Sequence, residues 1–63
     1  MKRNKLAGII VEKGYTQKDI AAKIGITPKT FYLKMKKGVW NTDEIQKMIV
    51  LLDIKDAADI FLS

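Results

Sequence analysis

The chain has 63 residues, a formal net charge of +5, 48% hydrophobic residues, and neither cysteine nor histidine. It is long enough for one globular domain, it cannot form a disulfide, and it lacks the ligands of the usual zinc sites. No apolar run approaches the roughly 20 residues that a membrane-spanning helix needs, and Leu6–Val11 is too short for a signal peptide. These features predict a soluble, intracellular, single-domain protein.

The positive charge is concentrated in the first part of the chain. Residues 1–38 carry ten of the 12 basic residues and two of the seven acids, whereas residues 39–63 carry an excess of acids. This asymmetry favours a basic face for a polyanion and a separate role for the C-terminal part. A lysine-rich surface can also serve solubility alone, so the charge leaves both interpretations open.

The pattern predicts helices and no strands, because Val, Ile and Thr never alternate with polar residues over the length of a strand. A first helix is expected over residues 4–13. Its apolar residues Leu6, Ile9 and Ile10 recur at helical spacing and should face the core. Gly14 suits a left-handed cap at its C-terminal end.

A second helix is expected over residues 17–24. Thr16 is a good N-cap, and Asp19 stands three positions later, as in a capping box. Gly25 can supply the positive φ that ends the helix, and Ile26 is expected to plug the turn that follows. The buried face should consist of Ile20, Ala21 and Ile24.

A third helix is expected over residues 28–37. Thr27 is its N-cap, and Pro28 is preset for the first helical position. Phe31 and Met35 lie one turn apart and should pack against the second helix. The opposite side of this helix, which is rich in lysine, is then left facing outward.

Beyond Gly38, a fourth helix is expected over residues 42–52, with Asn41 or Thr42 as its cap, and a short fifth helix over residues 56–62. All connections are short, which indicates a compact all-α bundle. The core side of the fourth helix should carry Ile45, Met48, Ile49 and Leu52.

Two short helices joined by a tight turn, with a basic outer side on the second, are typical of a helix-turn-helix that enters the DNA major groove. Backbone amides at the start of the first of these helices can hold a phosphate. The expected base contacts are Pro28, Lys29, Tyr32 and Leu33. The expected phosphate contacts are Thr16, Gln17, Lys18, Thr27, Lys34, Lys36 and Lys37.

This segment resembles the helix-turn-helix of small phage Cro/CI-type repressors, and the resemblance covers nearly the whole chain. It implies a compact five-helix, repressor-like bundle that binds DNA in the cytoplasm of a bacterial host. In that family the position of Gln17 typically holds a phosphate, and the positions of the four expected base contacts typically meet bases. The matching residues are Gln17, Ala21, Ile24, Gly25, Ile26, Thr30, Phe31 and Met35.

One departure from the family concerns base recognition. Many relatives carry Gln where Pro28 stands, and Gln can grip adenine. Pro28 has no side-chain donor, so it is limited to apolar contact, as with a thymine methyl group. Lys29 is then the best candidate for guanine, with Tyr32 beside it. Each has an alternative: Lys29 could touch only phosphate, Tyr32 could pack on the first helix, and Leu33 could be ordinary surface or a dimer contact.

The expected partner is a double-stranded DNA operator, bound by a homodimer that forms in solution or only on DNA. No metal, cofactor or small-molecule substrate is expected. The candidate dimer contacts have an alternative role in the monomer, since Trp40 can pack in its own loop and the C-terminal residues can close the core. They are Trp40, Ile60, Phe61 and Leu62.

A second hypothesis is a protein-binding module on the same fold, such as an antirepressor or antitoxin, with Trp40 and the acidic C-terminal segment as its working surface. Catalysis is not expected, because there is no histidine, cysteine or Gly-rich phosphate loop. The carboxylates are interpreted instead as helix caps and solvated surface groups: Glu12, Asp19, Asp43 and Glu44.

Overall fold

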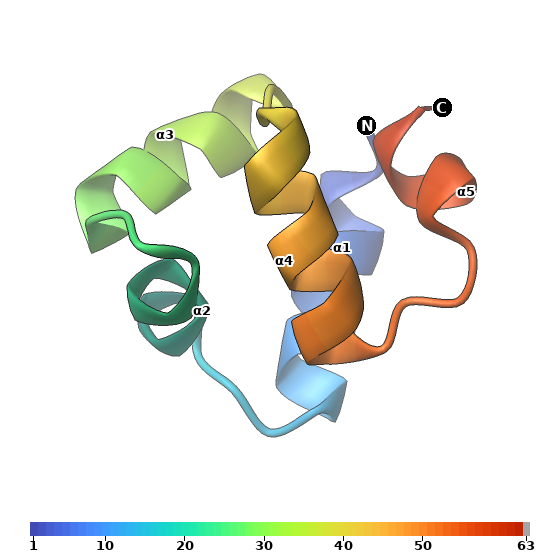
Figure 1. The fold of residues 1–63 in the computed structure, drawn as a ribbon, viewed down its shortest axis with the longest axis horizontal. Helices are drawn as coiled ribbons and strands as arrows, with labels where there is room; N and C mark the ends of the chain where they lie inside the picture. Colours follow the sequence, from blue (N-terminus) through green and yellow to red (C-terminus); the bar gives the residue numbers. More distant parts are fainter. Residues whose placement is uncertain (63) are drawn as a thin grey trace.

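The computed structural model describes residues 1–62, which form five α-helices and no strand (Figure 1). The predicted all-α bundle is confirmed. None of the helices in the described part of the chain combines the length and the apolar character that crossing a membrane requires. The helices are α1 (Arg3–Glu12), α2 (Gln17–Ile24), α3 (Pro28–Lys37), α4 (Thr42–Leu52) and α5 (Ala57–Phe61).

The bounds of α2, α3 and α4 are those predicted, because strong local signals mark their ends. Thr16 caps α2 through a reciprocal capping box, in which its Oγ1 accepts from the Asp19 amide at 3.1 Å and its amide donates to Asp19 Oδ2 at 2.9 Å. Gly25 then adopts the left-handed conformation, with φ of 85°, and redirects the chain toward α3. The Thr27 hydroxyl accepts from the Thr30 amide at 3.2 Å and so caps α3.

The predicted ends of the first and last helices were less accurate. α1 begins and ends one residue earlier than residues 4–13, and α5 is one residue shorter at each end than residues 56–62. The start of α1 and α5 lie side by side (Figure 1). There the Lys2 amide donates to the Ile60 carbonyl at 2.8 Å, and Lys2 and Lys5 both form ion pairs with Asp59.

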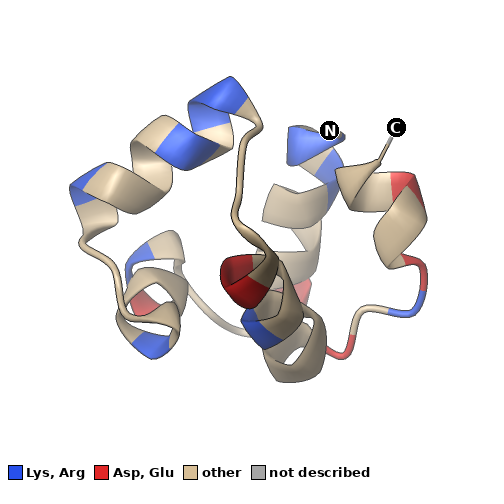
Figure 2. Cartoon of the chain, turned by 45° about the horizontal axis from the view of Figure 1, so that its top comes forward, with Lys and Arg blue, Asp and Glu red and all other residues tan. Residues whose placement is uncertain are grey.

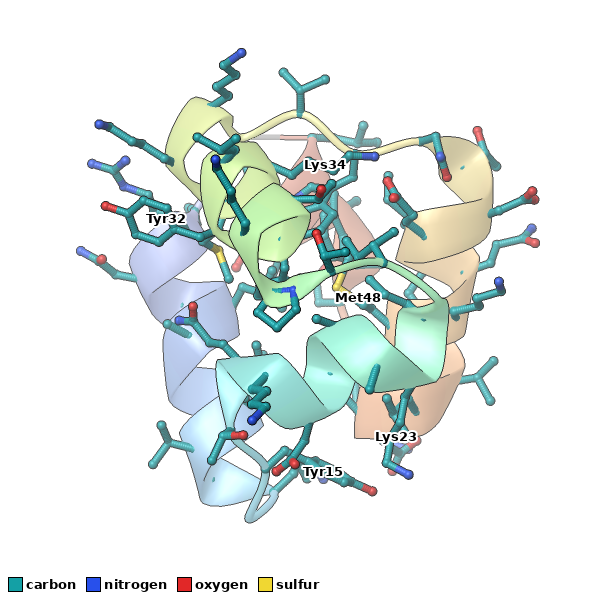
Figure 3. All side chains as sticks on the ribbon, turned by 90° about the vertical axis from the view of Figure 1, so that its left-hand side faces the viewer. Tyr15, Lys23, Tyr32, Lys34 and Met48 are labelled. Atoms are coloured by element: carbon teal, nitrogen blue, oxygen red, sulfur yellow. The ribbon has the colours of Figure 1, made fainter. Side chains whose placement is uncertain are left out.

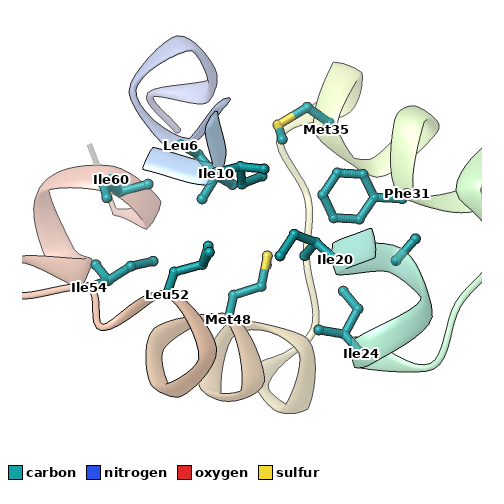
Figure 4. Packing of buried hydrophobic residues seen from close by; sticks show 11 residues of the cluster. Leu6, Ile10, Ile20, Ile24, Phe31, Met35, Met48, Leu52, Ile54 and Ile60 are labelled. Atoms are coloured by element: carbon teal, nitrogen blue, oxygen red, sulfur yellow. The ribbon is translucent and has the colours of Figure 1, made fainter. Parts of the chain in front are cut away.

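A single core lies between the helices (Figure 4). Ile45 was expected in it, but it is only partly buried and stands outside the cluster, whereas Ile54, which no pattern indicated, is buried. Ile54 turns inward because Asp53 ends α4 in the left-handed conformation, with φ of 51°. The buried members of the core are Leu6, Ile10, Ile20, Ala21, Ile24, Phe31, Met35, Met48, Leu52, Ile54 and Ile60.

Glu44 is a helix cap, as expected, because it completes the capping box with Asn41, but it is buried and not solvated, at 4% exposed. Its carboxylate accepts from Lys34 Nζ at 2.6 and 2.8 Å and from the Asn41 amide at 3.0 Å. Burial alone would raise the pKa of Glu44, but the hydrogen bonds from Lys34 and Asn41 outweigh it and hold the pKa below its ordinary value. Asn41, and not Thr42, is the N-cap of α4. The ion pair between Lys34 and Glu44 thus joins the last turn of α3 to the first turn of α4.

Candidate nucleic-acid interface

The rotation of α3 about its axis is set by its buried side. Phe31 is 1% exposed and Met35 is 7% exposed, so both hold α3 against the core. The other side of the helix therefore faces solvent, where Tyr32 is 59% exposed and Leu33 43% exposed. We call the exposed residues Lys29, Tyr32, Leu33 and Lys36 the outer edge of α3.

The start of α2 lies on the same face as this outer edge. Gln17 of α2 and Tyr32 and Lys36 of α3 line one shallow depression, together with Arg3 and Met35. Figure 3 shows Tyr32 projecting from α3 on the side where α1 begins. Three of the expected contacts are thereby brought together: Gln17 of α2 with Tyr32 and Lys36 of α3, which lie 15 or more residues further along the sequence.

Arg3 is a cation of this face that the sequence pattern did not single out. Its Nη1 donates to the carbonyl oxygen of Lys36 at 3.1 Å, so it satisfies one of the unpaired carbonyls at the end of α3. The other two basic residues near the chain start, Lys2 and Lys5, pair instead with Asp59. The basic composition of the N-terminus indicated that a cation could lie at this face. The local sequence did not indicate which of Lys2, Arg3 and Lys5 reaches α3.

The start of α2 keeps two outward backbone amides. Within the described residues, the amides of Gln17 and Lys18 donate to no protein acceptor, whereas those of Thr16 and Asp19 are used in the capping box. The hydrogen bond from the Thr16 amide, followed by that from its hydroxyl, lowers the pKa of Asp19. Asp19 therefore remains an anion beside the helix end, and the amides of Gln17 and Lys18 are the ones left without a protein acceptor there.

Thr27 also has a local role. Its hydroxyl accepts from the Thr30 amide and donates to Thr30 Oγ1 at 2.9 Å. Pro28 and Lys29 follow at the exposed start of α3, where they are accessible to a ligand. The hydroxyl of Thr27 therefore has less capacity for a phosphate than the neighbouring residues.

The three lysines near the end of α3 differ from one another. Lys34 is part-buried, and its ammonium is committed to the Glu44 carboxylate, with its side chain 30% exposed. Lys36 and Lys37 are exposed and have no ion-pair partner among the described residues. Of the expected phosphate contacts in this region, Lys36 and Lys37 are thus accessible to a ligand. A phosphate at Lys34 would compete with the Glu44 carboxylate for its ammonium.

Basic and acidic residues are unevenly distributed over the molecule, although several form ion pairs. Figure 2 shows basic residues along α3 and at the start of the chain, and acidic residues at the start of α4 and around α5. No group of His, Asp or Glu side chains suited to a metal ion is present in the described residues. The face that contains the outer edge of α3 carries Lys29 and Lys36, and Arg3 lies beside it.

The four candidate dimer contacts occupy different environments. Trp40 packs edge-on against Phe31, with ring centroids 5.0 Å apart, and its Nε1 donates to Met1 Sδ at 3.0 Å. Ile60 is 2% exposed and serves the core, so it has almost no surface for a second protomer. Phe61 is partly buried against the same core. Of the four, Leu62 is the most accessible, at 83%.

Comparisons with known proteins match one family over nearly the full chain. Residues 2–62 match the family described as protein of unknown function (DUF739). No curated protein and no solved structure matches the chain. On the extent of this match, the chain belongs to the DUF739 family.

Proposed function

We propose that this protein is a sequence-specific, double-stranded DNA-binding transcriptional regulator of the phage Cro/repressor type, and that α3 enters the major groove. The observation that carries the proposal is the outer edge of α3 lying on one face with the start of α2. A helix of ten residues is about 15 Å long, and the major groove admits an α-helix lengthwise. The resemblance of residues 16–38 to the helix-turn-helix of those repressors supports the same function.

The flanking groups are suited to hold the DNA backbone. Gln17 and Lys18 offer amides and side chains at the positive end of α2. Arg3, Lys36 and Lys37 supply cations near the other end of the outer edge. Contacts of this kind set the orientation of a protein on the duplex and carry no sequence information by themselves.

Sequence recognition would come from the start of α3. Lys29 is the donor that can reach the guanine O6 and N7 acceptors, and Tyr32 lies one turn further along the same helix. Pro28 and Leu33 offer apolar surface to thymine methyl groups. Because no amide side chain stands at position 28, the operator should lack the adenine contact that a Gln there makes.

A small repressor of this type acts as a dimer on a palindromic operator. Its two half-sites would be about 34 Å apart, or a multiple of that distance, so that two copies of α3 meet successive turns of the same groove. Leu62 and the accessible part of Trp40 remain candidates for the contact between protomers.

Selection of bound sites from a pool of random duplexes tests the proposal most directly. We expect an enriched palindrome, and we expect affinity, measured by fluorescence anisotropy, to fall steeply with salt. K29A should cost about 1–3 kcal/mol on the selected site and relax specificity at one position, whereas K36A should lower the salt slope by about 1 on every sequence. K55A is the matched control, because Lys55 pairs with Asp53 beyond α4 and is remote in sequence from α3.

The absence of duplex affinity at low salt would overturn the proposal. If a partner protein is bound with unchanged affinity by both K29A and Y32A, the protein-binding module becomes the better interpretation. An equal loss of DNA affinity in K55A and K29A would show that the protein binds DNA only by nonspecific charge attraction.

A further inference from the structure

A second exposed surface lies between α2 and α4 and plays no part in the proposed DNA contact. It is an open groove of about 490 Å³. Ile24 is buried, Leu51 is half-buried, and Val50 is 82% exposed in the last turn of α4. The groove is lined by Lys23, Ile24, Gln46, Lys47, Val50 and Leu51.

The charged residues that line this groove have one sign, although Asp19 and Glu44 lie near enough to interact electrostatically with Lys23 and Lys47. Both ionisable residues of its lining are lysines, one from each helix, and it contains no carboxylate. Neither Lys23 nor Lys47 forms an ion pair with any residue that the structure describes, although Lys23 lies 5.9 Å from the centre of the Tyr15 ring. An apolar groove with a cation on each side is complementary to a ligand with an apolar stripe flanked by anions.

The walls of the groove indicate the backbone form of such a ligand. Both walls are α-helices, and the described residues contain no strand, so there is no sheet edge that an extended peptide could join. A cleft between two helices accepts the ridge of a third, which places side chains at i, i+3, i+4 and i+7 along it. The shape therefore favours a helix over an extended segment.

We propose that the groove between α2 and α4 binds an acidic amphipathic helix of a partner protein. The apolar stripe of that helix covers Val50 and Leu51, and its flanking carboxylates meet Lys23 and Lys47. Figure 3 shows Lys23 and Tyr32 on opposite sides of the molecule. The groove is thus separate from the outer edge of α3, and a partner can dock there without displacing a ligand of that edge.

The test uses ¹⁵N-labelled protein and a synthetic helical peptide of about five turns, with Leu at the i, i+3, i+4 and i+7 positions and Glu on both flanks. We expect amide shifts to change first in the six lining residues. V50E and K47E should each weaken binding at least about tenfold, because each places a carboxylate opposite an acidic helix. V11E is the matched control, since Val11 is also exposed, at 74%, on a helix, and does not line the groove.

Four results would overturn the proposal. They are no shifts in the groove at millimolar peptide, equal binding of a peptide with Lys in place of every Glu, equal weakening by V11E and V50E, and concentration-dependent shifts of the same residues in the protein alone. The last would identify a second copy of the chain as the occupant. Duplex binding is measured in parallel and should be unchanged in V50E, so that a failure here is distinct from a failure of the DNA-binding proposal.

Discussion

The ion pair between Lys34 and Glu44 provides the sharpest test of how α3 is held in place. K34M removes the ammonium that lies 2.6 Å from the Glu44 carboxylate and keeps most of the side-chain volume. The carboxylate is then left 4% exposed, with the Asn41 amide as its remaining donor. Loss of one partner from a fully buried pair costs about 3–5 kcal/mol.

The expected cost here is smaller, because water reaches the Lys34 side chain, which is 30% exposed. We expect K34M to lower the free energy of unfolding by about 2 kcal/mol, intermediate between surface and buried pairs. For a domain of this size that corresponds to a fall in Tm of about 8–16 °C. Total stability is only about 3–9 kcal/mol at ordinary values per residue, so the loss is large.

Urea and thermal unfolding followed by far-UV circular dichroism measure this effect in a double-mutant cycle with E44Q. Gln at position 44 still accepts from the Asn41 amide but carries no charge. In the E44Q background, K34M should cost less than about 1 kcal/mol, which gives a coupling of at least about 1 kcal/mol. An equal cost in both backgrounds would refute the argument. If K34M instead leaves Tm unchanged and lowers the salt slope of duplex binding by about 1, Lys34 is a phosphate contact and not a structural one.

The pH dependence of the pair follows from the sign of the pKa shift. The folded-state pKa of Glu44 lies below its ordinary value of 4.5, so near that pH the unfolded chain binds more protons than the folded one. The stabilisation is therefore present above about pH 4.5 and is lost as the pH falls through the folded-state pKa. In E44Q this contribution to acid destabilisation should be absent.

Further predictions concern the chain ends and two glycines. Hydrogen bonds from Lys2 and Lys5 lower the pKa of Asp59 to about 2, so its stabilisation is present above about pH 4 and is lost as the pH falls toward 2. D59N should therefore lower stability at neutral pH and flatten its fall between these values, as measured by urea unfolding; an unaltered pH profile would contradict this. G25A should cost about 1–2 kcal/mol, because Gly25 has a φ of 85°. G8A should raise stability by about 0.5–1 kcal/mol, because Gly8 is helical and a Cβ there meets no atom within 4 Å. Thermal unfolding checks both, and a Tm change of the opposite sign in either variant would refute its explanation.

The helix-turn-helix segment could be predicted from the sequence because its signals act within four residues. The capping box of Thr16 and Asp19 and the left-handed Gly25 mark the ends of α2. The spacing of Phe31 and Met35 determines which side of α3 is buried, and hence which side is left outward. The ends of α1 and α5 were less predictable, because α1 has no side-chain cap and α5 has only five residues.

The tertiary structure alone decided which cations of the candidate interface are free. Lys34 and Lys36 both belong to a basic helix end in the sequence, yet Lys34 pairs with Glu44 ten residues away. Arg3 donates to the carbonyl of Lys36, which lies 33 residues later in the sequence, while Lys2 and Lys5 form ion pairs with Asp59. Periodicity determines the side of a helix on which a residue lies, but an ion pair depends on where a distant helix packs. The sequence by itself therefore determined the outer edge of α3, and the places that α1 and α4 take in the bundle decided which charges reach that helix.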